Sequence, residues 1–443
     1  MKTYRKQLFR LAAPIFIETL LFMLLGVADI YMLSQYNDLA AGAVGAANQL
    51  INNLNLIFAI VSAGTAVLVA QNVGAKNKLE IERVSSVSIV MNLILGVCIS
   101  LPMLIWGEEI LHLMGVTSDL MVHAGSYIRI VGGALFLQAL LNTAAVIIRS
   151  HGYTKQTMLI SLGMNILNIF GDAVLIFGLF GAPVLGAKGV AIATTASRFL
   201  ATLVAYGFLF KKVVPAEMFR HILDKPKQVL KNLVKIGLPA ALENMSYSVS
   251  QTVVMSLILI SIGEFSYVTR TYAWSICWFA FLFAIAIGQA TQIMVGQSVG
   301  AKRIDEAYKI GLHNFKISFV LSLFTGLGLF LFGENLIGIY TDNPEIIAIG
   351  AATLAVDAFL EPGRTFNIVF INGLRGAGDV IFPVVMAMIS MWILGVGVGY
   401  FFAVVMGLGL PGFWIGFALD EWVRGFSMYL RWRSKKWKDK SLV

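Results

Sequence analysis

The stretch AQNVGAKNKLE at residues 70–80 has a near copy, GQSVGAKRIDE, at residues 296–306. The copies lie 226 residues apart in a chain of 443, so their spacing is about half of the chain. Four pairs of residues keep this spacing to within one residue: Arg149 and Arg375, Arg198 and Arg424, Pro14 and Pro239, and Glu18 and Glu243. Landmarks that recur at one spacing indicate an internal repeat, so we predict two copies of one structural unit.

The composition indicates a protein embedded in a membrane. Hydrophobic residues make up 58% of the chain and charged residues 13%, whereas a soluble domain is about a quarter charged. Apolar runs of about 20 residues, each long enough to cross a bilayer as a helix, recur along the chain. We therefore predict an all-α polytopic membrane protein with twelve transmembrane helices in two pseudo-symmetric six-helix bundles. The twelve runs are 12–35, 44–70, 86–107, 125–148, 157–181, 188–210, 234–262, 266–297, 309–332, 346–373, 380–405 and 409–430.

The basic residues predict the orientation of these spans. Of the 33 Lys and Arg residues, 28 lie in the N-terminal segment, in alternate loops, in the long central connection or near the C-terminus. The loops 107–124 and 333–345 contain carboxylates and no Lys or Arg. By the positive-inside rule both termini are cytoplasmic, in a multi-pass protein of the plasma membrane, which we expect to be a bacterial inner membrane. This distribution also accounts for the net charge of +9, so nothing points to nucleic acid as a partner.

The even number of spans in each half predicts how the halves are related. We expect an N-terminal six-helix lobe (1–210), a cytoplasmic linker (211–233) and a C-terminal six-helix lobe (234–443). Each repeat then starts and ends in the cytoplasm, which makes the two lobes parallel repeats around a central cleft, an architecture for alternating access. The sequence has no P-loop pattern, so transport driven by an ion gradient is the natural interpretation.

Several stretches, in this order and spacing, resemble the multidrug and toxic compound extrusion (MATE) family. They are APIFIETLLFMLLGVADIYMLSQY in the first span, VGAK after the second and eighth, NIFGDAVLIFG in the fifth, GLPAALENMSYSVSQ in the seventh and LRGAGD after the tenth. The resemblance covers essentially the whole chain. It implies an efflux antiporter, not an enzyme, that exchanges H⁺ or Na⁺ for organic, often cationic and amphipathic, compounds.

Carboxylates within the spans are candidate functional groups, because a charge at mid-bilayer costs about 2.5–3.5 kcal/mol on insertion scales. Asp172 lies one turn after Asn168 on the same helical face, and Asp29 lies in the first span. The family resemblance implies that Asp29, Asn168, Asp172 and Thr194 line the N-lobe cavity, although Thr195 is an alternative to Thr194. Two close carboxylates with amide and hydroxyl oxygens could coordinate a hard cation or share a proton. An interhelical hydrogen-bond network is the structural alternative.

A second group of carboxylates lies at repeat-equivalent and C-terminal positions. Glu18 and Glu243 each follow a proline by four residues, where a loosened helix can turn a carboxylate toward the cleft. The resemblance matches Glu243 to a Glu of the C-lobe cation site in one branch of the family. That branch pairs it with an Asp nearer to LRG in the tenth span, which is absent here. Asp357 and Glu361 are the remaining candidates, with a salt bridge to Arg364 as the structural alternative.

Two rival functions remain open. A flippase for lipid-linked saccharides shares the broad architecture, but it would need a strongly cationic cleft, whereas the ionisable groups here lean acidic. A membrane-embedded enzyme would need a clustered catalytic motif, and we find none. We expect no metal site and no cofactor apart from the coupling ion, an organic cation or drug-like compound as substrate, and a monomer.

Overall fold

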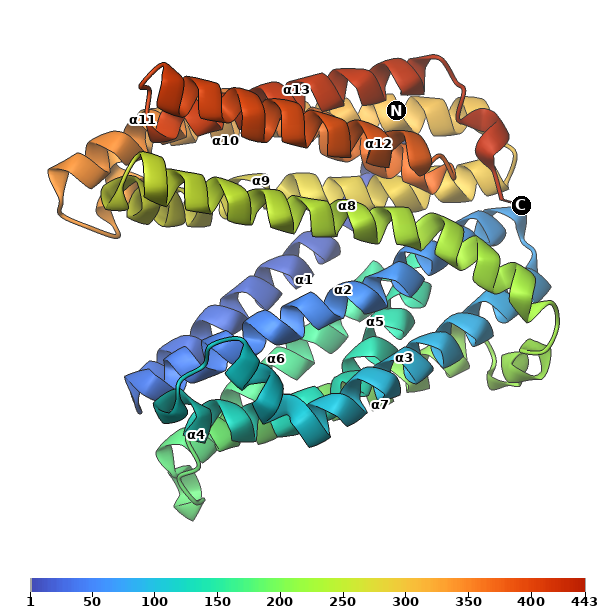
Figure 1. Ribbon diagram of the computed structural model, residues 1–443. Coiled ribbons are helices and arrows are strands. Elements are labelled where there is room, and N and C mark those ends of the chain that lie inside the picture. Colours follow the sequence, from blue (N-terminus) through green and yellow to red (C-terminus); the bar gives the residue numbers. More distant parts are fainter. Residues whose placement is uncertain (1, 443) are drawn as a thin grey trace. The chain divides into compact units, whose positions relative to one another are not determined.

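The computed structural model describes residues 2–442, and this part of the chain is helical and contains no β-strand. The chain forms two compact units, which are described separately (Figure 1). The N-lobe contains residues 17–73 and 77–238. The C-lobe contains the first 16 residues, Gly74–Lys76 and the chain from Pro239 onward.

The N-lobe is built mainly from seven helical segments. They are α1 (Lys2–Ser34), α2 (Asp38–Ala75), α3 (Lys78–Leu113), α4 (Ser118–Tyr127), α5 (Leu135–Ser150), α6 (Thr154–Phe177) and α7 (Ala187–Lys212). A short π-helix, η1 (Ile128–Gly132), joins α4 to α5, and the pair is bent by 47°. Small residues let these helices approach closely: a Cβ at Gly96 of α3 would lie 2.6 Å from the Cα of Phe136.

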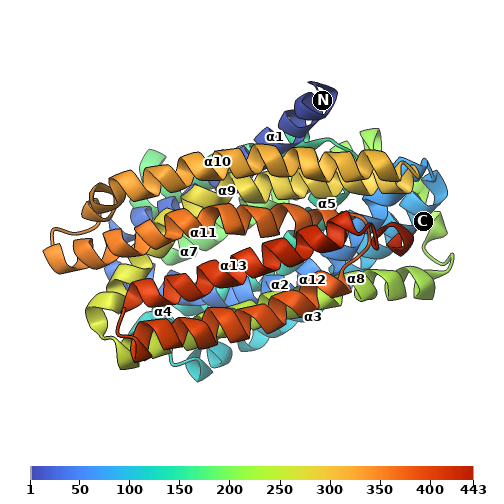
Figure 2. The ribbon, with the colours of Figure 1, turned by 90° about the horizontal axis from the view of Figure 1, so that it is seen from above.

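The C-lobe is arranged around a central helix, α11 (Pro344–Gly376). It packs against α9 (Glu264–Gly300), α10 (Ile304–Gly338) and α13 (Leu410–Arg433), which lie side by side in Figures 1 and 2. The lobe is completed by α8 (Pro226–Ser261), α12 (Ile381–Ser390) and two π-helical segments, η4 (Met391–Val398) and η5 (Phe401–Val405). An aromatic cluster that includes Phe370 and Trp432 fills the core where α11 meets α13.

The predicted twelve-span fold is confirmed. In the described residues nine helices are long and apolar enough to span a membrane, and α4, η1 and α5 together make a tenth, bent span. Helices α8 and α13 complete the six-plus-six arrangement, although polar residues within them, such as Glu243 and Asp420, lower their hydropathy. Two predicted spans differ in detail: the run 125–148 is broken at Ala134, and the run 380–405 continues from α12 into π-helix. Helix α8 already begins at Pro226, since proline is favoured in the first turn of a helix.

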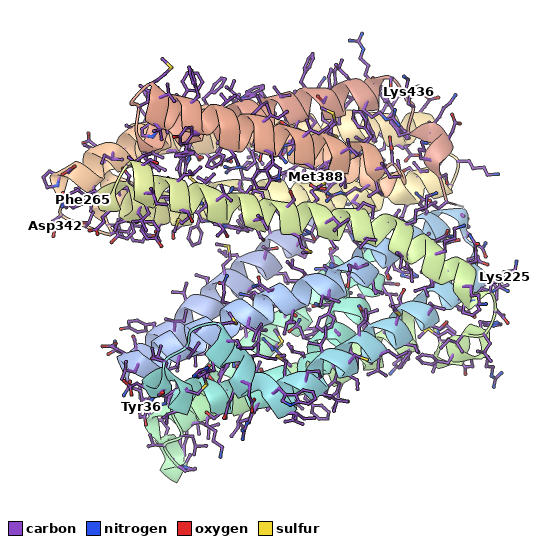
Figure 3. All side chains as sticks on the ribbon, in the orientation of Figure 1. Tyr36, Lys225, Phe265, Asp342, Met388 and Lys436 are labelled. Carbon is purple, nitrogen blue, oxygen red and sulfur yellow. The ribbon has the colours of Figure 1, made fainter. Side chains whose placement is uncertain are left out.

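Loop residues of each lobe lie at its two ends. In the C-lobe, Phe265 and Asp342 lie at one end and Lys436 at the other (Figure 3). In the N-lobe, Tyr36 and Lys225 likewise lie at opposite ends.

Both copies of the repeated VGAK stretch end a long helix. Lys76 and Lys302 follow helices α2 and α9 in the left-handed region, with φ of 56° and 58°. Gly74 belongs to the C-lobe, where the backbone of Gln297 lies so close that any Cβ at position 74 would collide with it. The repeated glycine therefore permits close backbone packing at this helix end.

Candidate ion and substrate sites

The N-lobe brings together the four residues that the sequence placed in its cavity. Asn168 and Asp172 lie one turn apart on α6, Asp29 lies on α1 and Thr194 on α7. The Asn168 amide satisfies both neighbours when its nitrogen donates to Asp29 Oδ1 (3.2 Å) and its oxygen accepts from Thr194 Oγ1 (3.2 Å). Thr194, and not Thr195, is thus the threonine of this cluster.

The carboxyl groups of Asp29 and Asp172 lie close enough for their charges to interact. Asp172 is fully buried, and neither of its oxygens has a hydrogen-bond partner among the described residues. Two ionised carboxylates so close together repel one another in a poorly hydrated site. The pair can therefore share a proton or attract a cation, and both options remain chemically open at this point.

Three residues near this cluster were not identified as site residues from the sequence. The Tyr127 hydroxyl, buried at the start of the bend in the fourth span, donates to Asn48 Oδ1 (3.0 Å). Arg198 lies one turn after Thr194 on α7, close enough to Asp29 for their charges to attract. Arg198 forms no ion pair with a carboxylate of the described residues, so its interaction with Asp29 is limited to this longer-range attraction. The only sequence signal that placed Arg198 near this site is its position one helical turn after Thr194.

The repeated glutamates lie in matching ion pairs. Glu18 is 4% exposed and lies 3.4 Å from Arg149, and it accepts hydrogen bonds from Thr157 and Ser161, each at 3.1 Å. A cavity of about 80 Å³ adjoins it. In the C-lobe the equivalent Glu243 pairs with Arg375 at 2.5 Å. The glutamates and arginines that recur in the sequence therefore meet in each lobe.

Asp357 and Glu361 form a buried triad with Arg364, all on α11. Both carboxylates are fully buried; Arg364 pairs with Glu361 and lies 3.6 Å from Asp357. Trp414 Nε1 donates to Asp357 at 3.0 Å. The salt bridge predicted as the structural alternative is thus present, and Arg364 supplies the charge that compensates the two carboxylates.

A cavity of about 480 Å³ lies within the C-lobe. Of the triad only Arg364 lines it, together with Glu243, whereas Asp357 and Glu361 are not among its lining residues. Two further carboxylates of this cavity, Asp420 and Glu421 on α13, were not identified from the sequence. Both pair with Arg424, at 2.6 Å and 3.0 Å, and share its single positive charge.

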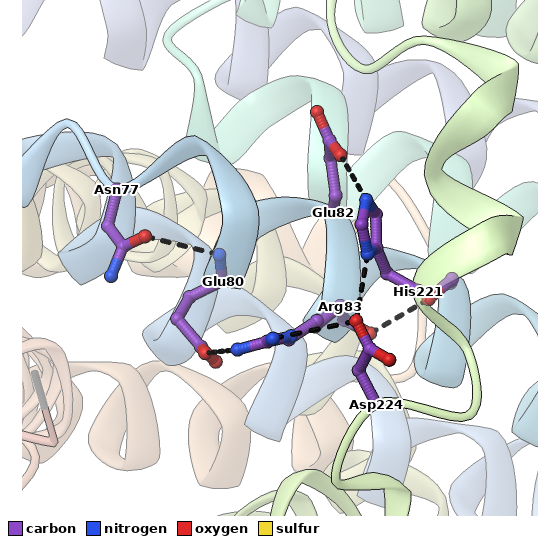
Figure 4. Close-up of polar contacts among 7 residues, drawn as sticks. Asn77, Glu80, Glu82, Arg83, His221 and Asp224 are labelled. Carbon is purple, nitrogen blue, oxygen red and sulfur yellow. Dashed lines mark hydrogen bonds and ion pairs between the residues drawn. The ribbon is translucent and has the colours of Figure 1, made fainter.

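A polar cluster fastens the central connection to the N-lobe (Figure 4). His221, at the end of the 3₁₀ segment η3 (Ala216–His221), contacts Asp224 (2.8 Å) and Glu82 of α3 (3.6 Å). Arg83 bridges Glu80 and Asp224. The hydrogen bond from His221, followed by that from Arg83, lowers the pKa of Asp224 below its ordinary value. This cluster holds the connection in place and is not part of the cavities.

The two helical lobes, with their ionisable groups buried among membrane-length helices, define a multi-pass membrane transporter. Comparison with known proteins makes this specific: the MatE family matches residues 14–174 and 239–401. The chain belongs to the MatE family.

Similar proteins cover nearly the whole chain. It is 42% identical over 98% of its length to the "Uncharacterized transporter YisQ" of Bacillus subtilis, covering 96% of that protein. It is 27% identical over 99% of its length to the "Probable multidrug resistance protein NorM" of Thermotoga maritima, covering 94% of it. The solved structure of the outward-facing conformation of a multidrug resistance MATE family transporter has the same fold, with a TM-score of 0.89 at 24% identity, covering 98% of this chain and 96% of that one.

Proposed function

We propose that this protein exports organic cations in exchange for protons by alternating access, with the N-lobe cluster as the site that proton and substrate share. The observation that carries the proposal is the cluster of Asp29, Asn168 and Thr194, with the fully buried Asp172 one turn from Asn168 on the same helix. Relatives named as multidrug resistance proteins support the substrate class. The finer assignment rests on the chemistry of this cluster.

The carboxyl pair can couple the two fluxes by competition. With a proton shared between them, Asp29 and Asp172 carry one charge, and a bound organic cation requires that proton to leave. A proton that enters along a membrane potential supplies about 2.3 kcal/mol per 100 mV, which is useful work for expelling a cation. One acidic site is then sufficient for exchange, because proton and cation exclude each other.

A proton fits this chemistry better than Na⁺ for two reasons. In the arrangement that satisfies its neighbours, the oxygen of Asn168 accepts a hydrogen bond from Thr194 and is not free to coordinate an ion. In the C-lobe, the guanidinium of Arg364 already compensates the buried carboxylates Asp357 and Glu361. These C-lobe carboxylates thus have an arginine partner, whereas Asp172 of the N-lobe has no ion-pair partner among the described residues.

The rival functions fit the site less well. A flippase for lipid-linked saccharides would bind a pyrophosphate, which the two N-lobe carboxylates would repel. A membrane-embedded enzyme would need a clustered catalytic motif, and the sequence shows none. We place both termini in the cytoplasm of a plasma-membrane transporter, on the basis of the Lys and Arg distribution.

The test uses Asp29→Asn and Asp172→Asn in reconstituted vesicles. Proton movement induced by ethidium, a fluorescent organic cation, is measured with a pH gradient at fixed Na⁺ and with a Na⁺ gradient at fixed pH. We expect each variant to lose coupled exchange while it remains folded, because a neutral Asn is cheaper to bury than a charge. Normal exchange in both variants would rule out the site, whereas wild-type exchange that needs Na⁺ and ignores the pH gradient would rule out the ion.

A further inference from the structure

Arg270 of α9 is a buried cation that the proposed exchange does not use. Three arginines of the C-lobe are 7% exposed: Arg270, Arg364 and Arg424. Arg364 and Arg424 have carboxylate partners, whereas no carboxylate of the described residues pairs with Arg270. Its guanidinium donates to Gln251 Oε1 (2.7 Å) and contacts Met255 Sδ (2.8 Å), and its Nε has no partner.

A buried guanidinium without a counter-ion is costly, so its presence needs a reason. Long basic side chains near helix ends often extend to the membrane surface, but Arg270 instead contacts Gln251 and Met255 of α8. The fold does not require a basic residue here, because the equivalent position of the first repeat is Val44. The cation is therefore a specific feature of the C-lobe.

Arg270 adjoins the C-lobe cavity. Its guanidinium lies over the Trp274 ring, 5.6 Å from the ring centre, and both Trp274 and Gln251 line the cavity. The volume of about 480 Å³ lies within the range of small-molecule sites. Five aromatic side chains contribute to the lining: Tyr247, Trp274, Trp278, Phe281 and Phe417.

The other charges of the lining are already compensated. Glu243 pairs with Arg375, and Asp420 and Glu421 pair with Arg424. The repeat positions that correspond to Asp29 and Asp172 of the N-lobe are Val254 and Val398, so the C-lobe does not reproduce the acidic cluster. Arg270 is thus the charged side chain next to this cavity that has no partner of opposite charge among the described residues.

We propose that the C-lobe cavity is a second substrate site, which binds an aromatic organic anion through Arg270 and the surrounding rings. The anionic group, a carboxylate or sulfonate, accepts hydrogen bonds from the guanidinium, whose Nε is free to donate. The aromatic body of the ligand packs against the tryptophan and phenylalanine rings. This site is separate from the acidic N-lobe cluster, and its ligand has the opposite charge.

Binding is measured on the full-length protein in lipid nanodiscs by quenching of tryptophan fluorescence, since Trp274 and Trp278 line the cavity. The probes are naphthoate, an aromatic anion, and naphthylmethylammonium, a cation of similar size. We expect the wild type to bind naphthoate more tightly than the cation at the quenched site. Arg270→Met and Arg270→Gln should each weaken naphthoate binding by about tenfold or more.

Arg303→Gln is the matched control, because it removes an exposed C-lobe arginine that pairs with Glu306. It should bind naphthoate as the wild type does. Arg270→Met should also melt at the same or a higher temperature, because it removes a buried, unpaired charge. Wild-type affinity for naphthoate in either folded Arg270 variant would overturn the proposal, as would a preference of the wild type for the cation. A lower melting temperature of Arg270→Met together with unchanged binding would assign Arg270 a structural role and overturn it equally. The binding assay requires no exchange, so its outcome is independent of the proton-coupling test.

Discussion

Replacing Arg364 with Gln should destabilise the protein strongly. The change removes the compensating charge of two fully buried carboxylates, Asp357 and Glu361, and leaves only the Trp414 hydrogen bond to Asp357. Breaking a buried ion pair by removing one partner costs about 3–5 kcal/mol, because the remaining charge is left without compensation. The guanidinium also lies 4.4 Å from the centre of the Phe281 ring, and the loss of this contact adds to the cost.

The double variant Arg364→Gln, Glu361→Gln should recover more than half of this loss. It removes one of the two freed carboxylates together with the arginine, and Asp357 keeps its hydrogen bond from Trp414. Replacing both partners of a buried pair is often nearly neutral. Acidic buffer should also narrow the gap between Arg364→Gln and the wild type, because protons neutralise the freed carboxylates. The free energy of unfolding is measured in bicelles for all three proteins. Arg303→Gln is again the control, because the exposed pair of Arg303 with Glu306 contributes about 0–1 kcal/mol.

A loss below about 1 kcal/mol for the single variant would refute the argument, since the cost of an unpaired buried charge is several times larger. A double variant as unstable as the single one would also refute it. That result would show that Arg364 acts through packing and not through its charge on Glu361.

Two further predictions concern the surface of the protein. Asp224→Asn should increase hydrogen exchange in residues 216–225 at neutral pH, because it removes the negative charge that His221 and Arg83 contact and one of the two acceptor oxygens. Contacts in the folded state lower the pKa of Asp224 below its ordinary 3.8, so they stabilise the fold above about pH 4. The wild type should lose this stabilisation only as the pH falls further. Unchanged hydrogen exchange in the variant would contradict this role of Asp224. A cysteine introduced at Lys302 should react with impermeant reagents only from the cytoplasmic side, and one at Glu109 only from outside. Labelling at Lys302 from outside would contradict the orientation.

The periodic features of the fold could be predicted from the sequence. Hydropathy predicts the spans and their number, because each span is a run of neighbouring residues in the chain. The duplicated unit follows from the spacing at which the landmarks recur. The break at Ala134 could not be predicted in this way. Its π-helical turn removes a regular helical hydrogen bond, and the surrounding apolar run gives no sign of it.

The candidate site was only partly predictable, for a physical reason. Asn168 and Asp172 share a helical face, which spacing alone predicts, and the family resemblance added Asp29 and Thr194. Tyr127 could not be found in this way, because its approach to the cluster depends on the bend between α4 and α5. Glu421 could not be assigned to the C-lobe cavity either, because the helices that α13 faces are determined by tertiary packing. Helical spacing predicts neighbours on one helix but not which helices face each other.

The two repeats share one kind of buried ion pair and differ in their other buried charges. The pair of Glu18 with Arg149 recurs as Glu243 with Arg375, so both lobes use it at the same place, as expected of an interaction that holds the first helix of each repeat to the fourth. The interior charges follow the opposite pattern.

Thr194 of the N-lobe corresponds to Asp420, Gln138 corresponds to Arg364, and Val44 corresponds to Arg270. Two copies of one helical framework thus tolerate quite different interior charges, so these charges are not required by the framework. An ion that the framework does not require is costly to bury, and its retention is best explained by a task. This reasoning favours functional roles for Asp29 and Arg270 and a structural role for the repeated glutamate–arginine pairs.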